Sequence, residues 1–96
     1  MITFYCDKMK KEFKDPYILQ FDRRASMTGN IPYYIVSFRN QGTPHGISQI
    51  FFMKKGLNYM TINGQKYTYM DIVKNPDLIE SLINKEKTKM ILDSLP

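Results

Sequence analysis

Apolar residues in this chain occur in short runs separated by polar segments, a pattern typical of strands joined by loops. Three runs predict strands, and they span Tyr17–Asp22, Tyr33–Arg39 and Ile47–Met53. The second run is nearly all apolar, so we expect it to be covered on both faces. The loops between the runs favour antiparallel neighbours, because parallel strands need a longer crossover.

Side chains alternate between the two faces of a strand, and this rule assigns the residues of the first run. Tyr17, Leu19 and Phe21 are predicted on one face, and Ile18 and Gln20 on the other.

In the third run two phenylalanines are adjacent. Phe51 and Phe52 must therefore face opposite sides of the strand. One of the two rings points away from the main core, and covering it requires the second helix or a partner.

A tight hairpin is the sharpest local signal in the chain. Leu57–Ile62 and Gln65–Met70 flank Asn63-Gly64, and this pair tolerates the positive φ angles of a two-residue type I′ turn.

Residues 1–15 favour a helix, because Cys6, Met9 and Phe13 recur at helical spacing opposite lysines. A short strand at Ile2–Tyr5 followed by a turn is the competing prediction. Pro16 ends the segment, since the residue before a proline disfavours the helical region.

A second helix is predicted to begin at Pro76, because proline suits the first helical position. An apolar stripe at helical spacing follows it: Leu78, Ile79, Leu82 and Ile83. Lys85–Lys89 predict a polar break, and Met90–Leu95 a short apolar tail that docks on the core.

Together these elements predict a single α+β domain over residues 1–96, with a central antiparallel sheet of about three strands, a small hairpin and two flanking helices. The formal net charge is +5, which is compatible with an anionic partner or with a solvated basic surface. One cysteine excludes an internal disulfide and favours a reducing compartment, so we expect a cytoplasmic protein, in its own cell or in a host cell. No run is long enough for a membrane helix, and we expect no membrane partner.

No catalytic motif is visible, and we expect a non-enzymatic protein without a cofactor. The chain has one cysteine and one histidine, whereas zinc takes four such ligands, so no metal site is expected. Arg23 and Arg24 with Ser26 in the following loop are a candidate anion site, since hydroxyls and backbone amides of such loops cradle phosphate. Gln20, Ser37 and His45 are the remaining ligand-binding candidates.

Several segments carry a resemblance to a known family. Tyr17–Asp22 reads Tyr-Ile-Leu-Gln-Phe-Asp and Tyr34–Arg39 reads Tyr-Ile-Val-Ser-Phe-Arg. Together with Gly56–Met60 and Pro76–Ile79, they resemble the SH2 domain, a phosphotyrosine-peptide binding module. The resemblance implies an SH2-like fold that docks a peptide. The family's phosphate-gripping arginine is replaced by Gln20, and its third-strand histidine has no direct counterpart, since His45 falls two residues early.

A weaker resemblance covers Phe4–Phe13, which is similar to the opening of small phage-type zinc-ribbon proteins, with Met9 at the second cysteine position. We therefore expect a binding module for an extended peptide or protein, with a phosphotyrosine peptide as one option. The alternative is a small phage-type inhibitor that blocks a host macromolecule such as a defence nuclease. A basic nucleic-acid binder is the third hypothesis.

Overall fold

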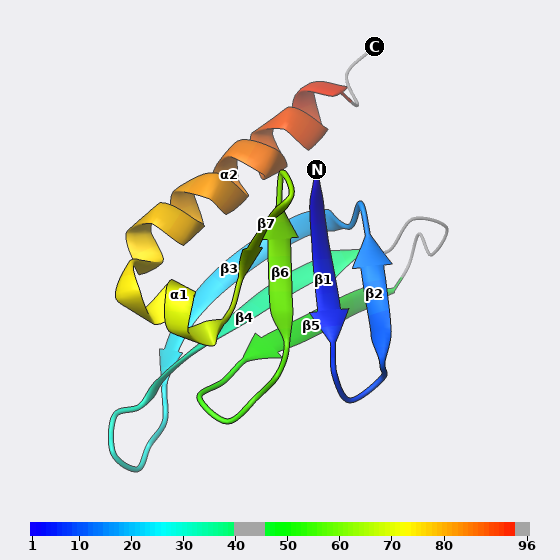
Figure 1. The fold of residues 1–96 in the computed structure, drawn as a ribbon. Coiled ribbons are helices and arrows are strands. Elements are labelled where there is room, and N and C mark those ends of the chain that lie inside the picture. Colours follow the sequence, from blue (N-terminus) through cyan, green and yellow to red (C-terminus); the bar gives the residue numbers. More distant parts are fainter. Residues whose placement is uncertain (40–45, 94–96) are drawn as a thin grey trace.

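The computed structural model describes residues 1–39 and 46–93, which form seven strands and two helices (Figure 1). In chain order they are β1 (Ile2–Cys6), β2 (Lys11–Lys14), β3 (Tyr17–Ala25), β4 (Pro32–Arg39), β5 (Ile47–Phe52), β6 (Tyr59–Ile62), β7 (Gln65–Tyr67), α1 (Tyr69–Lys74) and α2 (Pro76–Asp93).

The strands form two antiparallel sheets. The four-stranded sheet has the order β2-β1-β6-β7, and the three-stranded sheet has the order β3-β4-β5. Figure 1 shows the two sheets packed one in front of the other, with α2 alongside β3. The predicted α+β class and the antiparallel pairing of the three central strands are confirmed.

The core lies between the two sheets. Phe4 of β1 contacts Phe38 of β4 and Phe52 of β5, with ring centroids 5.0 and 6.4 Å apart, and all three rings are buried. Ile79 and Ile83 of α2 complete this core. Burial of each such side chain contributes about 1.5–3 kcal/mol, so this cluster is the main source of stability.

The helix predicted over residues 1–15 is wrong, because this segment forms the hairpin β1–β2. Ile2 and Phe4 are buried with the alternation of a strand, and β1 pairs with β6 on its other side. Met9 lies exposed in the turn. The apolar spacing that suggested a helix therefore joins residues of two strands and a turn.

The hairpin at Asn63-Gly64 is confirmed, with φ angles of 52° and 86° at the two turn residues. Its second strand is shorter than predicted, since it ends at Tyr67 and helix α1 follows, which the sequence interpretation missed. The carboxylate of Asp71 accepts hydrogen bonds from the backbone N–H and the hydroxyl of Thr68, at 2.8 and 3.0 Å. This capping arrangement starts α1 and turns the chain out of the sheet.

Helix α2 begins at Pro76 as predicted, but the polar break predicted at Lys85–Lys89 is wrong, since the helix continues to Asp93. Polar side chains in this stretch make inward contacts. The buried carboxylate of Glu86 accepts from the Met1 amino group at 3.0 Å, and Lys87 Nζ donates to the Leu19 carbonyl at 2.7 Å. The predicted tail therefore begins inside α2, and its last two residues lie outside the described part of the chain.

A β-bulge at Leu19 changes which side of the sheet the rest of β3 faces. Ile18 pairs with Phe38 of β4, and Gln20 pairs with Ser37, which directly precedes Phe38. Leu19 is therefore left without a partner. An unpaired residue shifts the alternation by one position. The prediction that Ile18 and Gln20 share a face is therefore wrong.

We expect Lys87→Ala to lower the free energy of unfolding by about 1–2 kcal/mol, because the carbonyl of the bulged Leu19 loses its donor. Alanine keeps the helix, so the loss reports on the hydrogen bond. Lys89→Ala, on an exposed part of α2, is the matched control and should change stability by less than about 0.5 kcal/mol. Urea denaturation measures both, and equal effects would contradict the assigned role.

The hydrogen bonds from Thr68 lower the pKa of Asp71 below its usual value of 3.8. A carboxyl with a lowered folded-state pKa stabilises the fold above its unfolded pKa, and this contribution is lost as pH falls through the folded value. We expect Asp71→Ala to cost about 0.5–1 kcal/mol at pH 7. The difference from wild type should shrink below about pH 3.8. A difference that is equal at pH 7 and pH 3 in urea denaturation would contradict this.

Candidate functional site

The face of the three-stranded sheet turned away from the four-stranded sheet is called the outer face here. Strand register places alternate residues on it. Its members are Tyr17, Gln20, Asp22 and Arg24 from β3, Tyr33, Ile35, Ser37 and Arg39 from β4, and Ile47, Gln49 and Phe51 from β5. Ile35 and Ser37 in the central strand are buried, Asp22 and Tyr33 are half-buried, and the other side chains are exposed.

Three of the predicted site residues lie together on the outer face. Gln20 Nε2 donates to Asp22 at 2.6 Å, and Ser37 Oγ accepts from Gln49 Nε2 at 3.4 Å. Arg24 is exposed there, and it forms no ion pair with any described residue. The outer face is thus polar at its β3 side.

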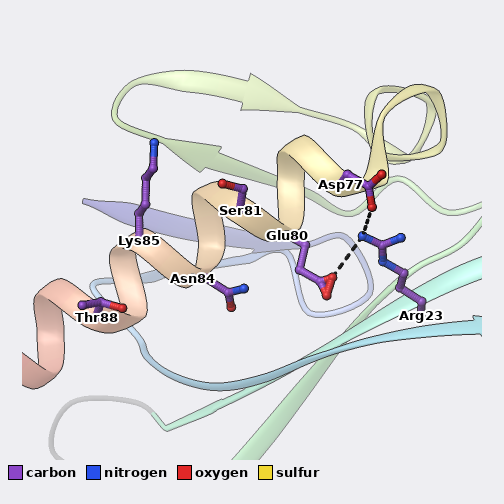
Figure 2. A pocket seen from close by; sticks show the side chains of 7 residues that line it. All are labelled: Arg23, Asp77, Glu80, Ser81, Asn84, Lys85 and Thr88. Atoms are coloured by element: carbon purple, nitrogen blue, oxygen red, sulfur yellow. Dashed lines mark hydrogen bonds and ion pairs between the residues drawn. The ribbon is translucent and has the colours of Figure 1, made fainter.

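Arg23 points to the other side of the sheet, toward α2. Its guanidinium bonds Asp77 at 2.7 Å and Glu80 at 3.0 Å, as Figure 2 shows. The hydrogen bond to Asp77 raises the pKa of Arg23 further above its usual value. A hollow of about 540 Å³ lies here along α2, but its arginine is already neutralised by two carboxylates. Arg23 and Arg24 therefore do not form one anion site.

Ser26, another predicted site residue, lies beyond the outer face in the loop after β3. Ser26 closes the β3–β4 loop, because its hydroxyl donates to the Thr28 carbonyl at 2.7 Å and accepts from the Ile31 N–H at 3.2 Å. This hydroxyl is used within its own loop. His45 lies outside the described residues.

Each sheet has two edge strands, and three of these four described edges are protected against pairing with another chain. β2 carries Lys11, Glu12 and Lys14, and charges on an edge discourage added strands. β7 is three residues long and leads into α1. β3 contains the bulge at Leu19 and lies along α2.

Strand β5 has none of these protections. Its six residues include no charged residue and no proline, and its pairing with β4 is regular from Ile47 to Phe52. Figure 1 shows β5 on the side of its sheet farthest from α2. β5 is therefore the one described edge strand that is regular and uncharged and that has no helix packed along it.

The direction of the β5 backbone groups follows from one hydrogen bond. Asn58 Nδ2 donates to the Phe51 carbonyl at 2.7 Å, so this carbonyl points away from β4. Backbone groups of alternate residues in an antiparallel strand point the same way. The N–H and C=O groups of Ile47 and Gln49 therefore also point outward, and no described residue bonds them there.

Apolar side chains accompany this open edge. Ile47 is 64% exposed, Phe51 38% and Met53, directly after the strand, 48%. Phe52 is fully buried, which confirms the prediction that the adjacent phenylalanines face opposite sides. The open edge itself was missed, because sequence does not reveal the order of strands in a sheet, although the absence of charge in β5 was a visible signal.

Within residues 1–39 and 46–93 no three potential ligands among His, Cys, Asp and Glu cluster as a metal site would require. Neither helix, over its described residues, is long and apolar enough to cross a membrane. Comparisons of the chain with protein-family models, with curated proteins and with solved structures find no match.

We expect Arg23→Met to destabilise the protein slightly at low ionic strength and less at about 1 M salt, because the exposed ion pairs to α2 are screened. Arg24→Met is the matched control and should leave the urea midpoint unchanged at both salt concentrations. A salt-sensitive loss at Arg24 instead would contradict the assignment of Arg23 as the residue that holds α2.

Proposed function

We propose that the protein is a non-enzymatic binding module that takes up an extended peptide segment of a partner protein as an added strand on β5. The observation that carries this proposal is the unprotected edge of β5, the exception among the described edges. Strand addition is a common mode of peptide recognition, in which backbone bonds supply affinity and alternate side chains supply specificity.

The backbone of β5 has groups available for such pairing. Ile47 and Gln49 present N–H and C=O groups outward, and each new hydrogen bond contributes about 0.5–1.5 kcal/mol. Asn58 already occupies the Phe51 carbonyl, so the added strand lies mainly along the first half of β5. Ile47 and Phe51 offer apolar contacts to its side chains.

Charge around β5 favours an acidic partner segment. Arg39 lies opposite Ile47 on the outer face, Lys54 and Lys55 follow the strand, and none of these cations has an ion pair among the described residues. Two copies of the chain paired antiparallel through β5 would bring these cations toward one another. Like charges disfavour that arrangement, whereas Asp, Glu or a phosphorylated residue would neutralise it.

The phosphotyrosine specificity implied by the SH2 resemblance is part of this proposal only in a modified form. Gln20 bonds Asp22 and carries no charge, so the cations on hand for a phosphate are Arg24 and Arg39 of the outer face. An inhibitor that blocks a host macromolecule would use the same edge. A cytoplasmic location agrees with the single unpaired cysteine.

The outer side of the four-stranded sheet gives less support to nucleic-acid binding. Tyr5 and Tyr59 stack on each other with ring centroids 5.0 Å apart, and Lys66 Nζ lies 4.3 Å from the Tyr59 ring centroid. The Tyr59 ring is therefore already in contact with two side chains of the protein. A stacking platform for bases requires an open ring face.

The test begins with selection of peptides from a displayed random library on the immobilised protein. We expect the enriched peptides to bind wild type but to lose at least tenfold in affinity for Gln49→Pro, measured by fluorescence anisotropy. Proline removes an outward N–H of β5 without removing a bond to β4. Gln49→Thr keeps this N–H and is the matched control, expected to bind like wild type.

Circular dichroism and thermal unfolding verify that the Gln49→Pro variant remains folded. The absence of any enriched peptide, or equal binding by folded Gln49→Pro and wild type, would show that the proposal is wrong.

A further inference from the structure

A second hollow opens beside the unprotected edge, between β2 and β5. It has a volume of about 310 Å³ and is called the β2–β5 hollow here. Its apolar lining consists of Cys6, Met9, Phe13, Phe38 and Ile50, with Ser48 between them on β5. The hollow is thus an apolar space at the inner side of an open strand.

The hollow exists because one inward position of β5 is small. Ser48, Ile50 and Phe52 share the inner side of this strand, and Ile50 and Phe52 are buried in the core. Ser48 lies opposite Phe38, and a larger side chain at this position would fill the hollow that both residues line. The half-buried ring of Phe13 and the buried ring of Phe38, with centroids 5.3 Å apart, both line this hollow.

We propose that the β2–β5 hollow is a specificity pocket that takes one large apolar side chain, such as Leu, Met or Phe, from the acidic peptide added to β5. This inference rests on the proposed function. Side chains of an added strand alternate between the two sides of the sheet, so every second one faces the inner side where the hollow lies. The outward ones contact Ile47 and Phe51.

The large apolar side chain proposed to enter the hollow is called the apolar anchor here. The cations around the hollow favour acidic residues next to it in the peptide. Lys11 lies at its rim, with Nζ 5.0 Å from the Phe13 ring centroid and no ion pair among the described residues. Arg39, Lys54 and Lys55 lie at the two ends of β5. A large apolar residue with an acidic neighbour therefore matches both the lining and the charge.

A second copy of this chain is a poorer occupant. In a β5–β5 pair, the inward residues offered by the other copy are its own Ser48, Ile50 and Phe52. Ile50 and Phe52 are already buried in the core of that copy and cannot leave it without unfolding the sheet. The hollow would then remain unfilled, which favours a separate peptide.

The experiment compares two peptides derived from the library selection, one with the apolar anchor and one with alanine at that position. Wild type should bind the apolar peptide about tenfold to 100-fold more tightly, the gain for burying a large apolar side chain. Ser48→Leu fills the hollow, so both peptides should bind this variant equally. Ser48→Ala keeps the hollow open and should retain the wild-type preference.

A second variant covers the case in which Ser48→Leu does not fold. Met9 is 60% exposed at the rim, so Met9→Glu leaves the core intact. The added carboxylate makes burial of an apolar side chain beside it less favourable, so the preference for the apolar peptide over its alanine variant should fall by at least fivefold. Met9→Leu is its matched control and should bind like wild type.

The outcomes separate this inference from the function on which it rests. If folded Ser48→Leu or Met9→Glu keeps the full preference while Gln49→Pro still abolishes binding, the pocket is wrong and strand addition stands. If binding is also unaffected in Gln49→Pro, both proposals fail. The pocket proposal would also be wrong if the enriched peptides shared no position that is limited to large apolar residues.

Discussion

The single unpaired residue in β3 is the constraint on which the arrangement of the surface depends. Leu19 has no partner in β4. Each residue after it therefore faces the side of the sheet opposite to the one that strict alternation would give. Arg23 is thereby turned toward α2, while Gln20 and Arg24 reach the outer face. The carbonyl of Leu19 accepts from Lys87, so the same irregularity fixes α2 along β3. One inserted residue thus determines both the location of the helix and the distribution of the cations.

Helix α2 protects the β3 edge of the three-stranded sheet, but the opposite edge lacks such protection. With the helix along one edge, the other edge strand, β5, has no covering element among the described residues. The helix also completes the core through Ile79 and Ile83, so the fold is closed on the β3 side and open on the β5 side. The binding surface proposed for β5 is therefore available because α2 lies along only one of the two edges of the three-stranded sheet.

Local signals in the sequence predicted those elements whose geometry depends on neighbouring residues. The turn at Asn63-Gly64 and the start of α2 at Pro76 are set by backbone preferences and were predicted correctly. The strands of residues 1–15 were mistaken for a helix, because their burial requires pairing with β6, far away in the sequence. The polar stretch Lys85–Lys89 was likewise misread, since Lys87 contacts the carbonyl of Leu19, which is far away in the sequence. Of the candidate site, Gln20, Ser37 and Arg24 were found to share a face, but which strands form the edges follows from topology alone.

The position of β1 has a consequence for how the chain is made. β1 precedes the other described strands in the chain, yet it lies in the interior of its sheet and pairs with β6, which follows the whole three-stranded sheet. A lone two-stranded hairpin is only marginally stable in water. Burial of Ile2 and Phe4 therefore requires a partner strand that is synthesised much later than β1. The core is therefore complete only when β6 and α2 have joined the elements that precede them in the chain.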